Sequence, residues 1–283
     1  MIIVRLMGGL GNQLFQYAIA RRLASETGQP FKLDITEYET DALRAFALRP
    51  FNVRQDIATL EEIDRLRPRA GGFLQNLRYS QTWIRERLPY AFDPRVVQAR
   101  GDVYLEGYWA NEDYFKSIDS VIRQEFTVKT EPDAANAAAA RVMASVASVC
   151  VHVRRGDYAT DPHTSAFHGL APLDYYREAA ARISATVRDP HFFVFSDDPD
   201  WVEQNLRFEH EMTYVTHNGA DRDYEDLRLM ALCRHHIIAN SSFSWWGAWL
   251  GQSPGQQVFA PARWLNQPEI DTTHATPARW IRL

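Results

Sequence analysis

Hydrophobic residues recur along the chain in two alternating patterns. Short apolar runs rich in β-branched and aromatic residues occupy 1–6, 31–35, 149–153 and 191–195, and they predict buried strands. Between such runs, apolar positions spaced three and four residues apart, as in 14–23, predict amphipathic helices. Strands that alternate with helices indicate an α/β fold, in which helices cover both faces of a parallel sheet.

The same two patterns define the remaining elements and the domain boundary. Further strands are expected at 102–105, 214–215, 237–239 and 258–260, and helices at 61–67, 74–88, 133–147, 172–187, 201–206, 224–233 and 241–250. The range 112–126 is expected to form a helix and a closing segment. The strand at 258–260 is expected to be the last. Asp133 and Asp223 are expected to cap the helices that follow them. We place the boundary within 128–148 and assign 1–135 and 136–283 to two Rossmann-like domains.

One predicted strand ends abruptly in charged residues. After 149–153 the chain continues with Arg154, Arg155, Gly156 and Asp157. Ligands of open α/β sheets bind at the carboxyl ends of strands, and arginine offers a planar, permanently charged fork of donors that matches a phosphate. The stretch therefore predicts an anion site, although the arginines could instead pair with Asp157 or another acid.

Glycines crowd the turn between the first strand and the first helix. Gly8, Gly9 and Gly11 form a strand–glycine–helix arrangement that aims backbone N–H groups and a helix N-terminus at an anion. Leu14 stands where a dinucleotide fingerprint has its third glycine, so no NAD site is expected. The alternative is a tight turn that needs glycine for its geometry alone.

Composition and charge exclude several classes of function. The 283 residues suffice for two domains, and 31 Lys and Arg against 36 Asp and Glu give a net charge of −5, which argues against nucleic acid as a partner. No apolar run reaches the ~18 residues of a membrane span, and Arg5 interrupts the first run, so it is not typical of a signal peptide. Cys150 and Cys233 lie in apolar surroundings, which favours buried thiols in a reducing compartment.

Three stretches carry a resemblance to one family. They are 152–158 (His-x-Arg-Arg-Gly-Asp-Tyr), 8–18 and 237–250, with weaker matches at 105–109 and 114–115. Taken in their order along the chain, the three stretches resemble those of the α-1,2-fucosyltransferases, glycosyltransferase family eleven, of the bacterial type. Residues 35–100 match poorly, and we expect the acceptor to be selected there.

The resemblance implies a fold, a reaction and partners. The fold is the GT-B architecture, two Rossmann-like domains facing a cleft, with 1–135 on the acceptor side and 136–283 binding the GDP-sugar. The reaction is inverting, metal-independent transfer of L-fucose from GDP-β-L-fucose to a galactose-terminated oligosaccharide, in α-1,2 linkage. No cofactor is expected, and the absence of the animal relatives' membrane anchor implies a cytoplasmic enzyme; the oligomeric state is left open. The alternatives are another sugar nucleotide, or a nucleotide-sugar-binding protein without turnover.

The donor diphosphate needs fixed positive charge where the glycosidic bond breaks. Arg154 is the predicted catalytic residue, assisted by Ser241, Ser242 and Ser244 at a helix N-terminus, where Ser242 is alternatively a plain N-cap. The other predicted donor-binding residues of the two glycine- and arginine-rich stretches are Gly9, Gly11, His152 and Arg155. His152 is alternatively a histidine of the core.

Two acidic residues follow the strand at 191–195. A carboxylate can accept guanine N1–H and N2–H₂ as a pair, and related fucosyltransferases use an acid after this strand, so Asp197 or Asp198 is expected to read the base. Alternatively Asp198 caps a helix that has Pro199 at its first position. Asp198-Pro199-Asp200 also matches the Asp-x-Asp of metal-dependent transferases; no metal is expected, because arginines and serines can neutralise the diphosphate.

The acceptor hydroxyl needs positioning and a route for its proton. Asn12 resembles the asparagine in the glycine turn of protein O-fucosyltransferases, and we carry it over as a positioning residue. Asp157 is a second candidate for the reacting centre, but an ion pair with Arg155 is favoured, so the base is left unassigned. Tyr108 and Trp109 are candidates to stack on the acceptor sugar.

Overall fold

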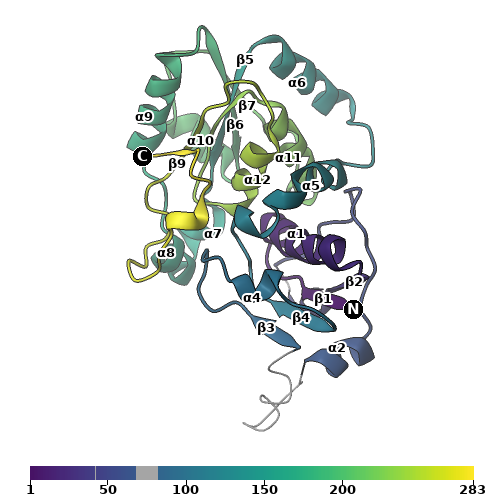
Figure 1. Cartoon of the computed structure of the whole chain (residues 1–283). Coiled ribbons are helices and arrows are strands. Elements are labelled where there is room, and N and C mark those ends of the chain that lie inside the picture. The colour runs from purple at the N-terminus through teal and green to yellow at the C-terminus, as the bar shows by residue number, and fades with distance from the viewer. Residues whose placement is uncertain (42, 68–81) are drawn as a thin grey trace. The chain divides into compact units, whose positions relative to one another are not determined.

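The chain folds into two compact α/β units. The computed structural model describes residues 1–41, 43–67 and 82–283. The first unit comprises Met1–Lys129 with Thr273–Ala275, and the second comprises Thr130–Thr272 with Thr276–Leu283 (Figure 1). Each unit is built on its own parallel sheet, which confirms the predicted α/β class.

The first unit has a four-stranded parallel sheet in the order β2-β1-β4-β3. Its strands are β1 (Ile2–Arg5), β2 (Phe31–Asp34), β3 (Trp83–Arg85) and β4 (Val103–Glu106). Its helices are α1 (Leu10–Thr27), α2 (Leu60–Leu66), α4 (Pro94–Val97) and α5 (Asp119–Glu125), with single turns η1 (Thr36–Glu39), η2 (Glu112–Tyr114) and η3 (Lys116–Ile118).

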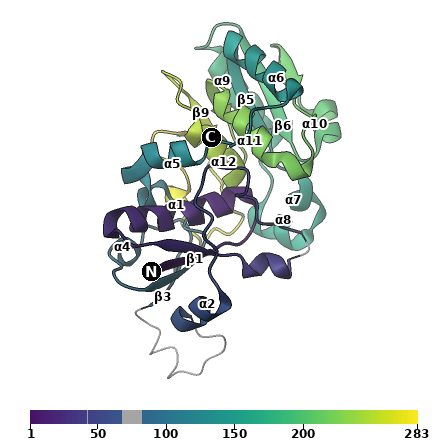
Figure 2. The ribbon, with the colours of Figure 1, turned by 90° about the vertical axis from the view of Figure 1, so that its right-hand side faces the viewer.

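Side-chain alternation along β1 explains how this sheet is covered. Ile3 packs with Ile63 and Leu66 of α2 on one face of the sheet. Neighbouring residues of a strand point to opposite faces, and Figure 2 shows α1 running along the other face.

The second unit has a six-stranded parallel sheet in the order β10-β9-β8-β5-β6-β7. Its strands are β5 (Ala147–Val153), β6 (Pro190–Ser196), β7 (Met212–Tyr214), β8 (His235–Ile237), β9 (Val258–Ala260) and β10 (Ile281–Arg282). Its helices are α6 (Ala134–Ser145), α7 (Gly156–Thr160), α8 (Pro162–His168), α9 (Leu173–Ser184), α10 (Pro199–Asn205), α11 (Asp223–Leu232) and α12 (Ser242–Leu250).

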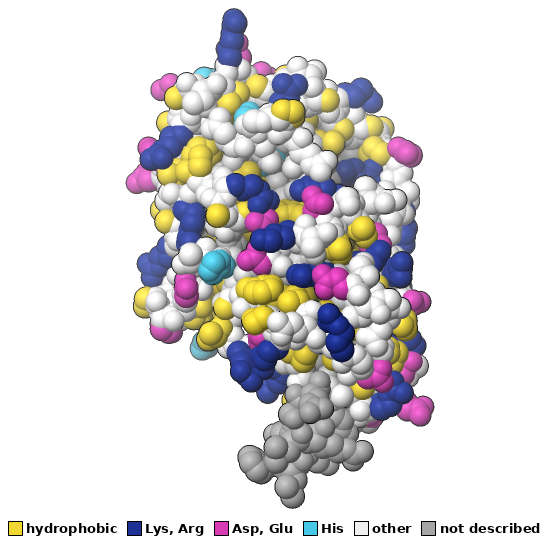
Figure 3. Space-filling view, in the orientation of Figure 1, with side chains coloured by type: hydrophobic (Ala, Val, Ile, Leu, Met, Phe, Trp, Pro, Cys, Tyr) yellow, Lys and Arg dark blue, Asp and Glu magenta, His cyan; other side chains and the backbone are white. Residues whose placement is uncertain are grey.

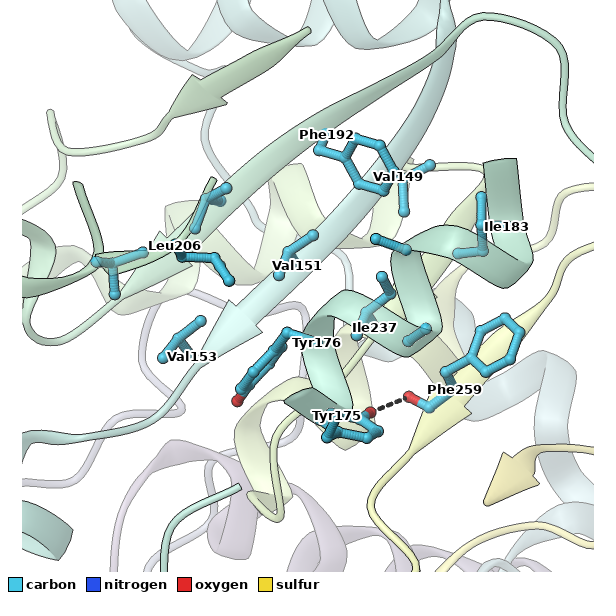
Figure 4. Packing of buried hydrophobic residues seen from close by; sticks show 14 residues of the cluster. Val149, Val151, Val153, Tyr175, Tyr176, Ile183, Phe192, Leu206, Ile237 and Phe259 are labelled. Carbon is cyan, nitrogen blue, oxygen red and sulfur yellow. Dashed lines mark hydrogen bonds between the residues drawn. The ribbon is translucent and has the colours of Figure 1, made fainter. Parts of the chain in front are cut away.

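Strand β5 is one of the two central strands of the second unit's sheet and is buried on both faces. Figure 4 shows Val149, Val151 and Val153 packed with Tyr175 and Tyr176 of α9. The Tyr175 hydroxyl donates to the carbonyls of Ile238 and Phe259 at 2.7 and 2.9 Å, which ties α9 to two strands.

The opposite face of β5 carries the thiol predicted to be buried. Cys150 packs there with Phe193 and Met230, and Cys233 lies in the same cluster. Both cysteines are buried and form no disulfide, as predicted. With side chains buried on both faces, β5 holds its carboxyl end in a fixed position, where a binding site needs rigidity.

Four element predictions are wrong in part. Residues 83–85 of the expected helix 74–88 form strand β3, because pairing with β4 overrides the helical spacing; positions 74–81 lie outside the described residues. The range 112–126, expected to be a helix and a closing segment, forms two single turns, η2 and η3, before helix α5. Asp223 is the first helical residue and Arg222 the N-cap. Strand 258–260 is followed by β10, which pairs with it in parallel.

The surface carries charges of both signs, as expected from the nearly balanced numbers of basic and acidic residues. Lys and Arg side chains are interspersed with Asp and Glu over the face shown in Figure 3. None of the described helices combines the length and apolar character needed to cross a lipid bilayer.

Candidate functional site

Three neighbouring strands of the second unit end at one edge of its sheet. Strand β5 lies between β8 and β6, and all three run parallel. Their carboxyl ends therefore bring Arg154 and Arg155, Asp197 and Asp198, and the serines that follow β8 to one edge. This is the edge at which open α/β sheets bind ligands.

Arg154 is held in place by a carboxylate and an aromatic ring. Its Nη1 lies 2.8 Å from Oδ2 of Asp197, and its side chain is 22% exposed. The guanidinium carbon lies 5.3 Å from the ring centre of Tyr158, which stacks on His168 at 4.5 Å. The carboxylate and the ring together fix the direction of the Arg154 guanidinium at this sheet edge.

Arg155 has a second acid and a second aromatic ring. Its Nε lies 3.1 Å from Oδ2 of Asp198, and its guanidinium carbon lies 3.5 Å from the Trp201 ring centre. Asp198 also caps α10 by accepting from the Trp201 N–H, so the capping alternative is confirmed. The acid seen against Arg155 is thus Asp198, whereas the expected partner Asp157 lies in α7 with its side chain outside the described part.

Asp197 contacts both arginines and lies close to Gly156. Its Oδ1 accepts from the Arg155 backbone N–H at 2.8 Å, while its Oδ2 pairs with Arg154. A Cβ on Gly156 would lie 2.3 Å from that Oδ2. The glycine is therefore needed because the carboxylate approaches the backbone closely.

His152 is a buried, neutral imidazole beneath this edge. Its side chain is 5% exposed, and its ring centre lies 5.6 Å from that of Phe243 in α12. Burial, with the charge of Arg154, lowers the pKa of His152 to about 3. By burial His152 is a histidine of the core, and its Nδ1 has no hydrogen-bond partner in the structure.

The serines at the start of α12 differ in what they can reach. Ser241 is the N-cap and accepts from the Phe243 N–H, so the alternative that made Ser242 the cap is wrong. Ser242 is the first helical residue and is partly exposed. Ser244 is fully buried and donates to the carbonyls of Ala239 and Ser241, so its predicted role in donor binding is wrong.

The glycine turn of the first unit presents Asn12. Gly9 is the N-cap of α1, and Gly11 lies in its first turn. Gly8 has φ +74°, and a Cβ there would lie 2.6 Å from Asn12 Nδ2. Gly8 is therefore the glycine that the turn requires, a residue that glycine spacing alone did not distinguish from the other two.

Buried amides hold this turn from below. Gln16 accepts from the Met7 N–H at 3.0 Å, and Gln13 donates to the Gly8 carbonyl at 3.0 Å. Both glutamines are fully buried. Polar residues on the apolar face of a helix were the sequence signal for this arrangement, and our helix prediction did not use it.

A second strained turn in the first unit carries the aromatic candidates. Trp109 has φ +55°, and its side chain is fully buried against Tyr114, so it offers no surface to a sugar and that prediction is wrong. Tyr108 is 46% exposed. Glu86 accepts from the backbone N–H groups of Tyr108 and Trp109, and burial raises the pKa of its carboxyl.

Acidic side chains surround one arginine at this edge. Arg5 pairs with Glu37 and Glu106, and the Trp83 indole donates to Glu106 at 2.8 Å. Neither sheet edge gathers three potential metal ligands, and the same is true of the rest of the described residues.

The similarity to known proteins extends over both units. All of the chain, residues 1–283, matches the sequence profile of Glycosyl transferase family 11. The chain is 31% identical to an Alpha-1,2-colitosyltransferase of Escherichia coli, over 100% of this chain and 98% of that one. It is 30% identical to the O-antigen biosynthesis glycosyltransferase WbnK of Escherichia coli, over 98% and 99% of the two chains.

Solved structures share the fold. Fucosyltransferase NodZ from Bradyrhizobium superposes with a TM-score of 0.55, at 18% identity, over 88% of this chain and 92% of that one. NodZ co-crystallised with GDP gives a TM-score of 0.56 at 17% identity, with the same coverage. The predicted GT-B type of fold, with two Rossmann-like units, is confirmed. The full-length profile match and two full-length relatives at 30% identity or more show that the chain belongs to glycosyltransferase family 11.

Proposed function

We propose that the protein transfers L-fucose from GDP-β-L-fucose, with inversion, to O2 of a galactose-terminated oligosaccharide. One observation carries the proposal: strands β8, β5 and β6 bring hydroxyls, a guanidinium and carboxylates to one sheet edge of a family 11 chain. In the reaction the acceptor hydroxyl oxygen attacks C1 of the fucosyl group. The bond from C1 to the phosphate oxygen breaks, and GDP leaves with the negative charge.

The second unit, taken as residues 136–283, is assigned to the donor. We assign Arg154 to the leaving phosphate, with the Ser242 hydroxyl and the N-terminus of α12 as further donors. Ser241 contributes as the N-cap that orients that terminus. The fixed guanidinium supplies the positive charge that leaving-group stabilisation needs, and no metal or cofactor enters the proposal.

The nucleoside is assigned to the strand ends on either side of Arg154. Asp197 or Asp198 accepts from the guanine edge, using the carboxylate lone pairs that the arginines leave unused. The neutral imidazole of His152, with its unpartnered Nδ1, is assigned to the nucleotide. Arg155 contributes through Asp198, whose position it holds.

The first unit, taken as residues 1–135, is assigned to the acceptor. Gly9, Gly11 and the Asn12 amide position the reacting hydroxyl, and the exposed ring of Tyr108 stacks on the sugar. The residue that accepts the proton stays unassigned, with Asp157 as one candidate. We place the reaction in the cytoplasm, where the unbonded thiols of Cys150 and Cys233 stay reduced.

A second donor is favoured by one comparison. The relative at 31% identity over the full chain is a colitosyltransferase, and a colitosyl group differs from a fucosyl group by one hydroxyl. A hydrophobic pocket discriminates poorly between sugars that differ so little, whereas a hydrogen-bonding pocket discriminates strongly. GDP-colitose is therefore the competing substrate.

The deciding experiment is a donor and acceptor screen. GDP-fucose and GDP-colitose are each incubated with galactosides, GDP release is followed, and the product linkage is assigned by NMR. The proposal predicts faster release with GDP-fucose, dependence on a galactoside and an α-1,2 product. Preference for GDP-colitose would replace the donor. GDP binding without release in any combination would favour a non-catalytic binding protein.

A further inference from the structure

A small open cavity lies in the first unit beside the glycine turn. Its volume is about 280 Å³. The lining residues come from η1 with the residue before it and from the loop that follows, and they are Ile35, Tyr38, Glu39, Ala45, Phe46 and Arg49. Ligand pockets for drug-sized molecules span roughly 300–1,000 Å³, so this cavity suits one sugar ring and is too small for a nucleoside diphosphate.

Side chains anchored to the glycine turn fix the cavity walls. The fully buried Gln13 donates to the Ala45 carbonyl at 2.9 Å and accepts from the Ala47 N–H at 2.8 Å. The Gln13 amide also donates to the Gly8 carbonyl, and the Tyr38 hydroxyl donates to that same carbonyl at 3.0 Å. Because both walls are tied down, a ligand need not order them on binding.

The loop also reaches the start of α1. A Cβ on Gly9 would lie 3.7 Å from the Arg44 guanidinium. The cavity is therefore tied to Gly8 and lies on the same loop that approaches Gly9, both within four residues of Asn12. The cavity wall is thus anchored to the same glycine turn that carries Asn12, the residue that we assign to the acceptor hydroxyl.

The lining combines apolar ring faces with one charge of each sign. Arg49 lies over the Phe46 ring, with its guanidinium carbon 5.2 Å from the ring centre, and Tyr38 supplies a second ring. Glu39 balances the charge of Arg49. A lining with no net charge disfavours an anion such as phosphate, whereas aromatic faces with planar polar groups match the C–H faces and hydroxyl edges of a pyranose.

We propose that this cavity binds a neutral hexopyranose residue of the acceptor glycan. The assignment rests on the proposed function, since it takes the transferase to use an oligosaccharide acceptor. It places selection of the acceptor in the segment 35–49, next to the turn that presents Asn12.

Kinetics of Phe46 variants test the assignment. Phe46→Ala removes a ring face from the cavity, so KM for a galactoside acceptor should rise about tenfold, while kcat and GDP affinity stay within twofold. Phe46→Tyr keeps the ring and should restore the wild-type KM. Leu43→Ala is the matched control, because Leu43 lies on the same loop, is 88% exposed and does not line the cavity. An unchanged KM in Phe46→Ala would overturn the assignment.

Direct binding separates failure of the cavity from failure of the proposed function. If the wild-type protein turns over no GDP-sugar, saturation-transfer NMR with methyl β-galactoside still compares wild type and Phe46→Ala. Binding that is lost in Phe46→Ala and kept in Leu43→Ala supports the cavity. Equal signals in all three proteins, or no signal in the wild type, reject it.

Discussion

The two sheet edges of this protein are built by different means. In the second unit ion pairs hold the arginine side chains: Arg154 pairs with Asp197, and Arg155 pairs with Asp198. In the first unit Arg5 also pairs with Glu37 and Glu106, but the turns that carry the candidate residues are held through their backbone. The Gln13 amide donates to the Gly8 carbonyl, and Glu86 accepts from two N–H groups of the turn at 107–109.

The difference matches the chemistry of the two substrates. A diphosphate binds most strongly to fixed positive charge, which an ion pair can orient. A neutral sugar is recognised by shape, ring faces and hydrogen bonds, which require a backbone in one conformation. The comparison implies that changes at the second unit's edge alter donor affinity and leaving-group departure, whereas changes at the first unit's edge alter acceptor positioning.

The largest effect is expected from Arg154→Lys. Lysine keeps the charge and loses the planar fork, so kcat should fall about 10³-fold, the equivalent of roughly 4 kcal/mol. Initial rates with saturating donor measure it. Arg177→Lys is the matched control, since Arg177 pairs with Asp174 at 3.0 Å on the exposed face of α9. Near-normal turnover of Arg154→Lys would remove the guanidinium from the mechanism.

Gly156→Ala should weaken donor binding next most strongly. The new Cβ would lie 2.3 Å from the Asp197 carboxylate, which must leave both arginines. We expect the Kd for GDP to rise about tenfold, or by roughly 1.4 kcal/mol, as measured by calorimetry, with the acceptor KM unchanged. If the acceptor KM changed and the GDP Kd did not, the two edges would have the reverse roles.

Gly8→Ala tests the first unit's edge in the same way. Alanine at φ +74° costs about 1 kcal/mol of stability, and its Cβ forces the Asn12 amide to rotate away. We expect kcat to fall about tenfold with the GDP Kd unchanged. Gly28→Ala is the control, because Gly28 has φ +68° with no heavy atom within 4 Å of its Cβ position. Equal kcat values in the two variants would show that Asn12 has no part in catalysis.

The last effect is on stability alone and concerns a carboxylate of the second unit that accepts from an amide. Asp226 accepts from the Asn218 amide at 2.8 Å, and burial raises its pKa to about 6. The unfolded chain releases this proton near pH ~4, so as pH rises from about 4 to 6 the carboxyl costs the folded state stability. Asp226→Asn removes that loss.

Urea unfolding at pH 4.5 and pH 7.5 measures this contribution. The variant should gain about 1–2 kcal/mol over wild type at the higher pH and little at the lower one. The same gain at both pH values would assign the effect to hydrogen bonding rather than to ionisation.

Much of the fold was predictable because a buried strand appears in the sequence as a run of apolar residues. Strand β5 is buried on both faces, and its apolar run predicted it to within two residues. Parallel pairing then placed Arg154, Asp197 and Ser242 at one edge. Strand β3 was missed because an edge strand of three residues has too few positions to show an alternation.

The site was less predictable because the partner of a side chain depends on which residues the fold brings near it, and these can be distant in sequence. Sequence distance offered Asp157 to Arg155, and it could not show that Asp198 reaches Arg155 from the end of the neighbouring strand. Trp109 resembled a sugar platform by composition, but φ +55° turns its ring into the core. Ser244 follows two serines in the same turn, and helical geometry points its hydroxyl back to the carbonyl of Ala239.

The thiols have a practical consequence. The two cysteines of the chain both lie in the second unit and are fully buried. An alkylating reagent can reach them only when that unit opens, so the rate of labelling in dilute denaturant reports its opening free energy. The first unit contributes no signal. Comparing labelling with loss of total fluorescence would therefore reveal whether the two halves melt as one cooperative body or separately.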